Sequence, residues 1–201
     1  MNDDKVLIIS SDCHAGTLPS GYNEYMPAKY HDQANQWWVQ YTREMMNRVG
    51  TFFDQEAVEA YSDDAGEGGG RMEAMSNPSV APNDKDLLDM LSDPSNPFAP
   101  RRGEYDAAVR IQELDDDGVA GEIVFPQMAP FGAGLMQYRH DVTPELNLEG
   151  CRAYNRWLAD FCNTNPKRMA GVALINVDNI DVTVQEIRDA HAAGIWGGVL
   201  L

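Results

Sequence analysis

The sequence has no long hydrophobic run. None of its 201 residues belongs to a stretch approaching the roughly 18–20 consecutive apolar residues of a membrane-spanning helix. Its opening residues Asn2, Asp3 and Asp4 are polar or acidic, whereas a secretory signal peptide opens with basic residues. We therefore expect a cytoplasmic protein with no membrane partner.

Basic residues are scarce as well. Lys and Arg number 15 against 32 Asp and Glu, which gives a formal net charge of −17. This charge repels phosphate backbones and anionic lipids, so it argues against a nucleic-acid partner and against a role at a membrane surface. Solubility alone is the simplest explanation of the acidity. With 43% hydrophobic residues, the chain has the composition of a folded globular domain.

Cysteine is represented by Cys13, Cys151 and Cys162 only, an odd number without disulfide or metal-site spacing. Cys151 and Cys162 fall in an amphipathic stretch and are expected in the core. Cys13 is expected to face away from its neighbours Asp12 and His14. No second histidine is arranged with Cys13 at short range, so we do not assign it as a nucleophile.

The opening strand, residues 6–9, leads directly to Asp12 and His14. Side chains two residues apart on a strand point to the same side, which suits two ligands of one metal ion. A structural alternative is that Asp12 caps the turn after the strand while His14 makes a local hydrogen bond.

Residues 17–102 form a long, irregular insertion after this first strand. One helix is expected in it, because Trp38, Tyr41, Met45 and Val49 recur at helical spacing before a glycine. A segment of this length inside a compact domain is typical of a lid or binding element, and a disordered surface insertion is the alternative. Trp37 and Trp38 could roof an aromatic pocket, but their spacing favours core packing.

Regular alternation of helices and strands begins at residue 103. Strands are expected at 121–126, 169–175 and 196–201. The first helix is expected to end at Gly118 and to bury Ala107, Ile111 and Leu114. The second begins at Thr143-Pro144 and buries Cys151, Tyr154, Leu158 and Phe161. The third is capped by Asp181, with an inner face of Val184, Ile187 and His191.

This alternation is typical of an α/β fold with a parallel sheet. The strands are nearly continuous apolar runs, so both faces of the sheet should be covered. A doubly wound sheet and a (β/α)8 TIM barrel both fit the pattern. No glycine-rich phosphate fingerprint follows the first strand, which favours the barrel.

Polar residues that follow the predicted strands are candidates for substrate binding, since barrel active sites lie at the carboxyl ends of the strands. Gln127 and Asn176 take such positions, and each could equally be a plain turn residue. His140 lies in the loop after the second strand, where it contacts substrate or solvent. His31 and His191 are expected to be structural.

Three segments carry a family resemblance in their order along the chain. They are residues 11–14, residues 110–119 leading into 122–126, and residues 154–158 before 166–171. Together they resemble the amidohydrolase-related metal-dependent hydrolases, a group that also contains nonoxidative decarboxylases related to aminocarboxymuconate-semialdehyde decarboxylase. The resemblance covers most of the chain outside the insertion.

The resemblance implies a (β/α)8 barrel enzyme in which Asp12 and His14 form an acid-x-His variant of a divalent-metal motif. The Asp12 carboxylate favours Mn²⁺ without excluding Zn²⁺. The implied activity is hydrolysis of a small organic substrate by a metal-activated water. A nonoxidative carboxy-lyase is the alternative, and a non-catalytic fragment or scaffold is a second one.

Family members take further ligands and a general base from later strands of the barrel. Residues 1–201 are therefore expected to be the N-terminal part of one barrel domain, with about the first four strands. The general base is expected beyond Leu201, and the fragment alone should be inactive. The full-length enzyme is expected to be a homo-oligomer.

Overall fold

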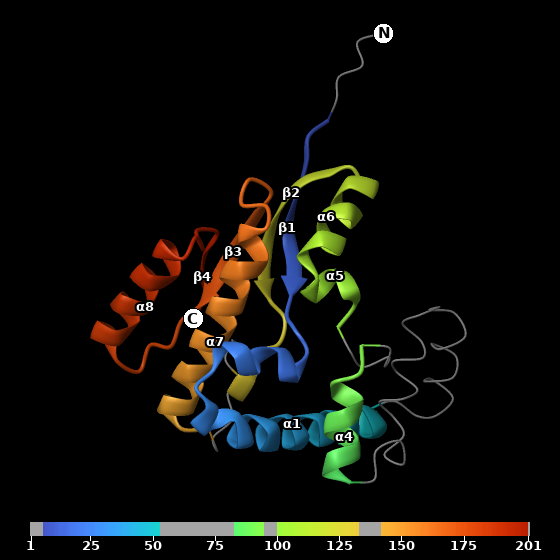
Figure 1. The fold of residues 1–201 in the computed structure, drawn as a ribbon, viewed down its shortest axis with the longest axis vertical. Coiled ribbons are helices and arrows are strands. Elements are labelled where there is room, and N and C mark those ends of the chain that lie inside the picture. Colours follow the sequence, from blue (N-terminus) through green and yellow to red (C-terminus); the bar gives the residue numbers. More distant parts are fainter. Residues whose placement is uncertain (1–5, 53–82, 95–99, 133–141, 201) are drawn as a thin grey trace.

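The computed structural model describes residues 6–52, 83–94, 100–132 and 142–200 (Figure 1). It shows an α/β fold with a four-stranded sheet in which all paired strands are parallel. The strands pair in chain order and are β1 (Ile8–Ala15), β2 (Val119–Pro126), β3 (Met169–Leu174) and β4 (Gly198–Leu200). The prediction of an α/β parallel sheet is confirmed.

Helices α6 (Ala107–Asp116) and α7 (Pro144–Asn163) cover the same face of the sheet. Glu122 of β2 is paired with Arg110 of α6, and a Cβ at Gly171 of β3 would touch Leu158 and Cys162 of α7. The parallel register places Val124, which lies two residues after Glu122, beside Gly171, so these side chains share one face. In Figure 1, α7 lies in front of the sheet, and α8 (Ile180–Ala192) lies beside α7.

The insertion is more regular than expected where the structure describes it. It contains the 3-10 helices η1 (Pro19–Tyr25) and η2 (Ala28–Tyr30), then α1 (His31–Phe52) and α4 (Asp84–Leu91). The predicted helix through Trp38 is confirmed, although it continues to Phe52. Figure 1 places α1 and α4 beyond the carboxyl ends of the strands. Residues 62–70, where the sequence is rich in Asp, Glu and Gly and predicts a charged loop, lie outside the described residues.

Trp37 and Trp38 are buried in the core, as their spacing predicts. The Trp37 ring stacks on Tyr41 with centroids 5.1 Å apart and also contacts Phe131 of η4 (Pro130–Gly132). The insertion thus packs against the segment that follows β2. This contact fixes α1 at the end of the sheet where a barrel would carry its active site.

The boundaries of α7 follow the sequence closely. The Thr143 hydroxyl accepts a hydrogen bond from the Leu146 amide, so the predicted cap is confirmed. The predicted inner stripe is also confirmed, because its four members, Cys151, Tyr154, Leu158 and Phe161, are all buried.

The short helix α5 (Arg102–Tyr105) precedes α6. Gly118 follows α6 and takes the left-handed conformation, with φ of 69°.

For α8 the predicted cap and inner face are both wrong. The side chain of Asn179, not Asp181, accepts the capping hydrogen bond from Val182. Val184 and Ile187 are 40% and 37% exposed, and His191 is exposed, whereas Thr183 and Ala190 are buried. The side of α8 that faces α7 carries Glu186 instead, and Arg152 of α7 binds this residue at 2.8 Å.

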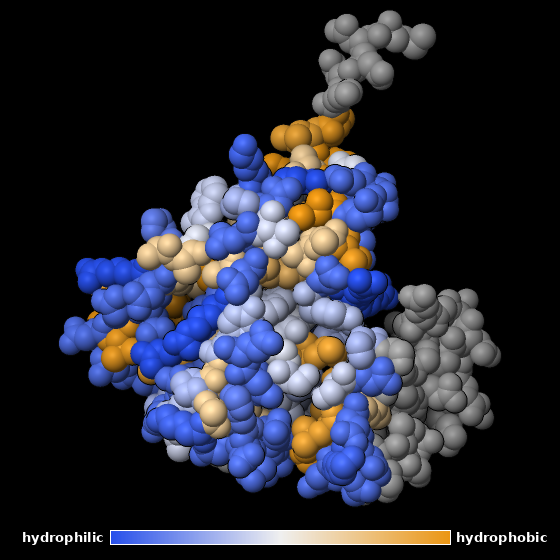
Figure 2. Space-filling model, in the orientation of Figure 1, coloured by the Kyte–Doolittle hydropathy of each residue, from blue (hydrophilic) through white to orange (hydrophobic). Residues whose placement is uncertain are grey.

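The outer strands are less covered than their apolar sequences predict. Ile8 and Ile9 of β1 and Val199 of β4 are exposed, Ile9 by 61%. Among the described residues, β1 pairs only with β2 and β4 only with β3. Figure 2 shows hydrophobic surface beside the N-terminal end of the chain. In the part of the chain that the structure describes, no helix has the length and hydrophobicity needed to span a membrane.

Candidate metal site

Asp12 and His14 lie on the same side of β1, as period-two alternation predicts. The Asp12 Oδ1 and His14 Nε2 atoms are 3.4 Å apart. The register between β1 and β2 shifts between Ser10 and Cys13, so the one extra residue of β1 is accommodated in the segment that contains Asp12. The Asp12 side chain is 85% exposed and the His14 side chain 50% exposed, so an ion from solution can reach both.

The orientation of the His14 ring is set by the neighbouring strand. Its Nδ1 atom lies 3.1 Å from the carbonyl oxygen of Pro126, at the carboxyl end of β2. A carbonyl only accepts, so Nδ1 donates and the neutral ring has its lone pair on Nε2, the atom nearest Asp12. Metal-binding histidines commonly donate their second ring N–H to such a carbonyl. The pair therefore presents a carboxylate oxygen and an imidazole nitrogen side by side.

The pair lines a groove of about 600 Å³ that also takes in Arg110 and Glu113 of α6, so the groove reaches round the outer edge of β1 from one face of the sheet to the other. Its walls come from β1, from α5 and α6, and from the residue that follows β2. The lining residues are Asp12, Cys13, His14, Arg101, Glu104, Arg110, Glu113, Asp116, Asp117 and Gln127. Five of these are acidic and two are basic, so the lining attracts cations.

Cys13 faces away from the pair, as predicted. Its Sγ donates to Ser10 Oγ at 2.9 Å, on the side of the sheet that carries Glu122. Burial raises the pKa of the Cys13 thiol, and the Glu122 carboxylate raises it further. The thiol is therefore protonated at neutral pH, which suits neither a nucleophile nor a metal ligand.

The predicted substrate-binding residues fall in different places. Gln127 lines the groove beside His14, and its backbone amide donates to the Ala15 carbonyl. The Asn176 amide donates to Asn147 of α7 and to Asp178 in its own loop after β3, and Asn176 does not line the groove. His140 lies outside the described residues. Sequence reasoning missed Arg101 and Glu104, which no spacing signal connects to β1.

A second, apolar cavity of about 30 Å³ lies at the same end of the sheet. It is enclosed by residues that follow β1 and β2 and by the insertion. Its lining residues are Gly16, Thr17, Pro19, Trp38, Leu91, Pro100, Gln127 and Met128. Gln127 therefore borders both this cavity and the groove.

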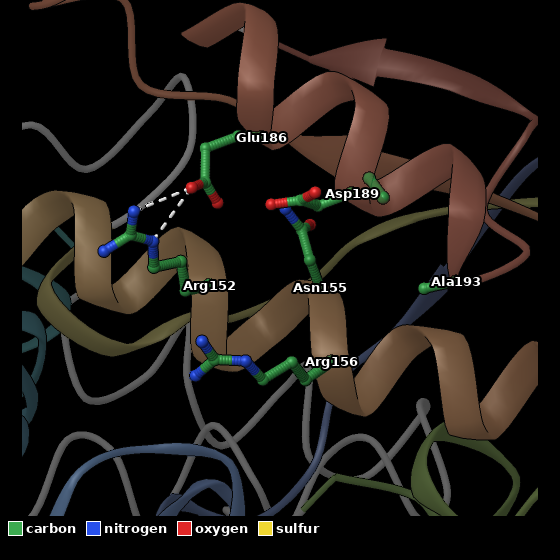
Figure 3. A pocket seen from close by; sticks show the side chains of 7 residues that line it. Arg152, Asn155, Arg156, Glu186, Asp189 and Ala193 are labelled. Carbon is green, nitrogen blue, oxygen red and sulfur yellow. Dashed lines mark hydrogen bonds and ion pairs between the residues drawn. The ribbon is translucent and has the colours of Figure 1, made fainter. Parts of the chain in front are cut away.

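A third pocket, between α7 and α8, has the features of a structural ion-pair site (Figure 3). Arg152 binds Glu149 at 2.6 Å and Glu186 at 2.8 Å, and both glutamates raise the pKa of Arg152. The side chain of Arg156 donates to the Tyr25 carbonyl. These charged groups are engaged in joining α7 to its neighbours, so we do not place the functional site here.

Asp12 and His14 are a pair and not a complete coordination sphere. Across the described ranges, no three His, Cys, Asp or Glu side chains are grouped to hold a metal ion. Two protein ligands fit one edge of a metal site, and a catalytic zinc site needs about three with an open position.

The chain matched no model of a known protein family, and a comparison with curated proteins gave no significant match.

Proposed function

We propose that this chain forms the first half of a (β/α)8 barrel in a metal-dependent hydrolase that acts on a small organic substrate. The strand order supports the barrel, because the four strands pair in chain order. A doubly wound sheet reverses its strand order at a switch point and carries helices on both faces. Here α6 and α7 share one face, and the Asp12–His14 pair lies on the other.

The exposed edges of β1 and β4 support the proposal that further strands pair with the sheet on both sides. Ile9 on β1 and Val199 on β4 expose apolar side chains beside backbone that pairs on one side only among the described strands. An uncovered apolar edge strand promotes aggregation, and barrel closure removes such edges. We infer that the next strands cover these edges and bring the remaining ligands and the general base.

The observation that carries the metal assignment is the geometry of His14. Its ring is held by the Pro126 carbonyl with Nε2 directed at Asp12 Oδ1, 3.4 Å away. Asp12 and His14 would hold Zn²⁺ or Mn²⁺, and a hard carboxylate beside an imidazole is compatible with both ions. Such an ion, when bound, supplies an activated water and polarises a carbonyl group.

The residues of this chain then have separate roles. Asp12 provides negative charge for the cation, and the Pro126 carbonyl orients the His14 ring through Nδ1 so that Nε2 faces the place of the ion. Gln127 can donate a hydrogen bond to a substrate carbonyl from its place in the groove. The exposed face of Asp12 leaves space for ligands from later strands.

One observation favours a nonoxidative carboxy-lyase as the second candidate. Arg101 lines the groove that contains Asp12 and His14. A guanidinium binds a carboxylate through two parallel hydrogen bonds, so Arg101 could hold the carboxylate that a decarboxylase removes. Both candidates use the same two ligands. They differ in product, since only the lyase releases carbon dioxide.

Metal binding by the whole natural protein tests the proposal. We expect purified protein to contain about one divalent ion per chain, measured by elemental analysis, and to rebind Zn²⁺ or Mn²⁺ in calorimetry after chelation. Asp12→Ala and His14→Ala should each weaken binding by about a hundredfold or more, as loss of a direct ligand exceeds the second-shell effect. Asp117→Ala removes a carboxylate from the same groove and should leave the affinity nearly unchanged.

Unchanged metal affinity in both Asp12→Ala and His14→Ala would contradict the proposal. A folded protein that binds neither ion would instead support a non-catalytic scaffold. With metal bound, the two enzyme candidates are separated by assaying amides and esters for hydrolysis and carboxylic acids for carbon dioxide release.

A further inference from the structure

The apolar cavity beside the groove is built by the insertion. Trp38 of α1 and Leu91 of α4 are 1% and 8% exposed, and both line it. The rest of the wall comes from the two segments that follow β1 and β2, where Gly16 and Met128 lie. A Cβ at Gly16 would approach the Met128 backbone to 3.3 Å, so these two segments are already in close contact. The insertion thus closes one side of a space that the sheet ends leave open.

The cavity adjoins the Asp12–His14 pair through Gln127. This residue lines both the cavity and the groove that contains the pair. Gly16 follows His14 by two residues, and Met128 follows Gln127 directly. A molecule whose polar group reaches Asp12 and His14 would therefore have an apolar compartment next to it, on the other side of Gln127.

The size of the cavity limits what it can hold. Its volume is about 30 Å³, whereas a single water needs only roughly 10–15 Å³ and a benzene ring occupies a cavity of about 150 Å³. The wall is mostly apolar, with Trp38, Leu91, Met128 and two prolines, and its polar side chains are Thr17 and Gln127 together with the Trp38 Nε1 atom, which has no hydrogen-bond partner among the described residues. A methyl or ethyl group matches both the size and the chemistry of this space, and an aromatic ring does not.

We propose that this cavity is a specificity pocket for a short aliphatic substituent of the substrate, and that Trp38 and Leu91 set its size. The inference rests on the proposed function, because the polar group of the same substrate is held at Asp12 and His14. It assigns a role to the insertion, which selects substrates by the length of an alkyl group. The substrate class is a small aliphatic acyl compound.

Binding of simple carboxylic acids to the Zn²⁺-loaded whole natural protein tests this pocket. The probes are acetate, propionate, butyrate and hexanoate, measured by calorimetry. We expect affinity to rise about fourfold for each methylene that enters the pocket, following the transfer free energy of a CH₂ group, and to stop rising once a methyl or ethyl end fills it, so that hexanoate gains nothing over butyrate. Leu91→Ala should shift the strongest binding to longer acids.

Leu91→Phe fills the space and should abolish the gain from acetate to butyrate while Zn²⁺ affinity stays unchanged. Leu88→Ala is the matched control, since Leu88 lies on the same helix but does not line the cavity. If Leu91→Phe does not fold, Leu91→Ala decides alone. Equal affinity for all four acids, or no acid binding, in protein that binds Zn²⁺ normally overturns the specificity pocket and leaves the metal site standing. Absence of Zn²⁺ binding overturns both.

Discussion

The Arg110 guanidinium of α6 binds the Glu122 carboxylate of β2 through hydrogen bonds of 2.7–3.1 Å, and the Glu122 side chain is fully buried. The pair lies on the helix-covered face of the sheet, behind the Asp12–His14 pair. Burial alone would lower the pKa of Arg110, but the hydrogen bonds to the Glu122 carboxylate and its negative charge together raise this pKa above its usual value. This ion pair attaches α6 to the sheet at the strand beside β1.

Replacing Arg110 with Leu should strongly destabilise the protein. The change leaves the Glu122 carboxylate buried without its partner, which costs about 3–5 kcal/mol in free energy of unfolding. Urea denaturation followed by circular dichroism measures this. Replacing both residues, Arg110→Met with Glu122→Leu, should cost clearly less than the single change. Lys85→Ala, which breaks an exposed pair with Asp89, should leave the free energy of unfolding almost unchanged. A small effect of Arg110→Leu would contradict the buried pairing.

Asn155 should be the most sensitive polar residue of α7. Its amide donates to the Leu174 carbonyl and accepts from the Leu174 N–H, both at 2.8 Å in a buried site. Asn155→Leu keeps a similar volume but leaves both backbone groups without this partner, at a cost of about 2–4 kcal/mol. Gln185→Ala, on the exposed side of α8, is the control and should stay within about 0.5 kcal/mol. Equal stability of the two variants in urea denaturation would be the contrary result.

The sequence predicted those features that depend on local spacing. The Thr143 cap and the buried stripe of α7 follow from capping preferences and periodicity, and both are found. Four strands are found as well, but β1 covers Ile8–Ala15, whereas the sequence predicted a strand at 6–9. The inner face of α8 was wrong because the side that meets α7 carries Glu186, which binds Arg152, and not the apolar stripe that includes Ile187. A polar contact 34 residues apart leaves no periodic signal.

In the candidate site, too, the sequence predicted the local spacing but not the contacts between distant residues. Period-two alternation correctly places Asp12 beside His14. The hydrogen bond that orients His14 joins it to Pro126 across 112 residues, so only the folded sheet reveals it. The cavity at Trp38 was likewise hidden, because it depends on how the insertion folds back over the strand ends. The two 3-10 helices of the insertion have no long periodic pattern to identify them.

Two buried thiols should make the protein less stable at alkaline pH. Burial raises the pKa of Cys151 and that of Cys162 to about 12 each, from an ordinary value near 9. Between about pH 9 and pH 12 the unfolded chain loses thiol protons that the native chain retains. The free energy of unfolding should therefore fall as pH rises through this window, by at most about 1.4 kcal/mol per pH unit for each thiol.

Urea denaturation at pH 8, 9 and 10 measures this slope. Tyrosines also titrate in this range, so the comparison is with the variant Cys151→Ala, Cys162→Ala under the same conditions. Its stability should decline less steeply above pH 9 than that of the natural protein. Identical slopes would show that the thiols are not desolvated in the native state. At pH 8 both thiols should react with a thiol reagent only after unfolding.

Gly171 should tolerate no larger side chain, because α7 lies directly on it. A Cβ at this position would be 2.9 Å from Leu158 Cδ2 and 3.2 Å from Cys162 Sγ. Gly171→Ala therefore overpacks the interface between α7 and β3 and should cost about 1–3 kcal/mol. Shortening the neighbour in Leu158→Val removes atoms from the contact, so the double variant should be more stable than the sum of the two single changes predicts. Additive effects in urea denaturation would mean that the two residues do not touch, and would contradict the placement of α7 on the sheet.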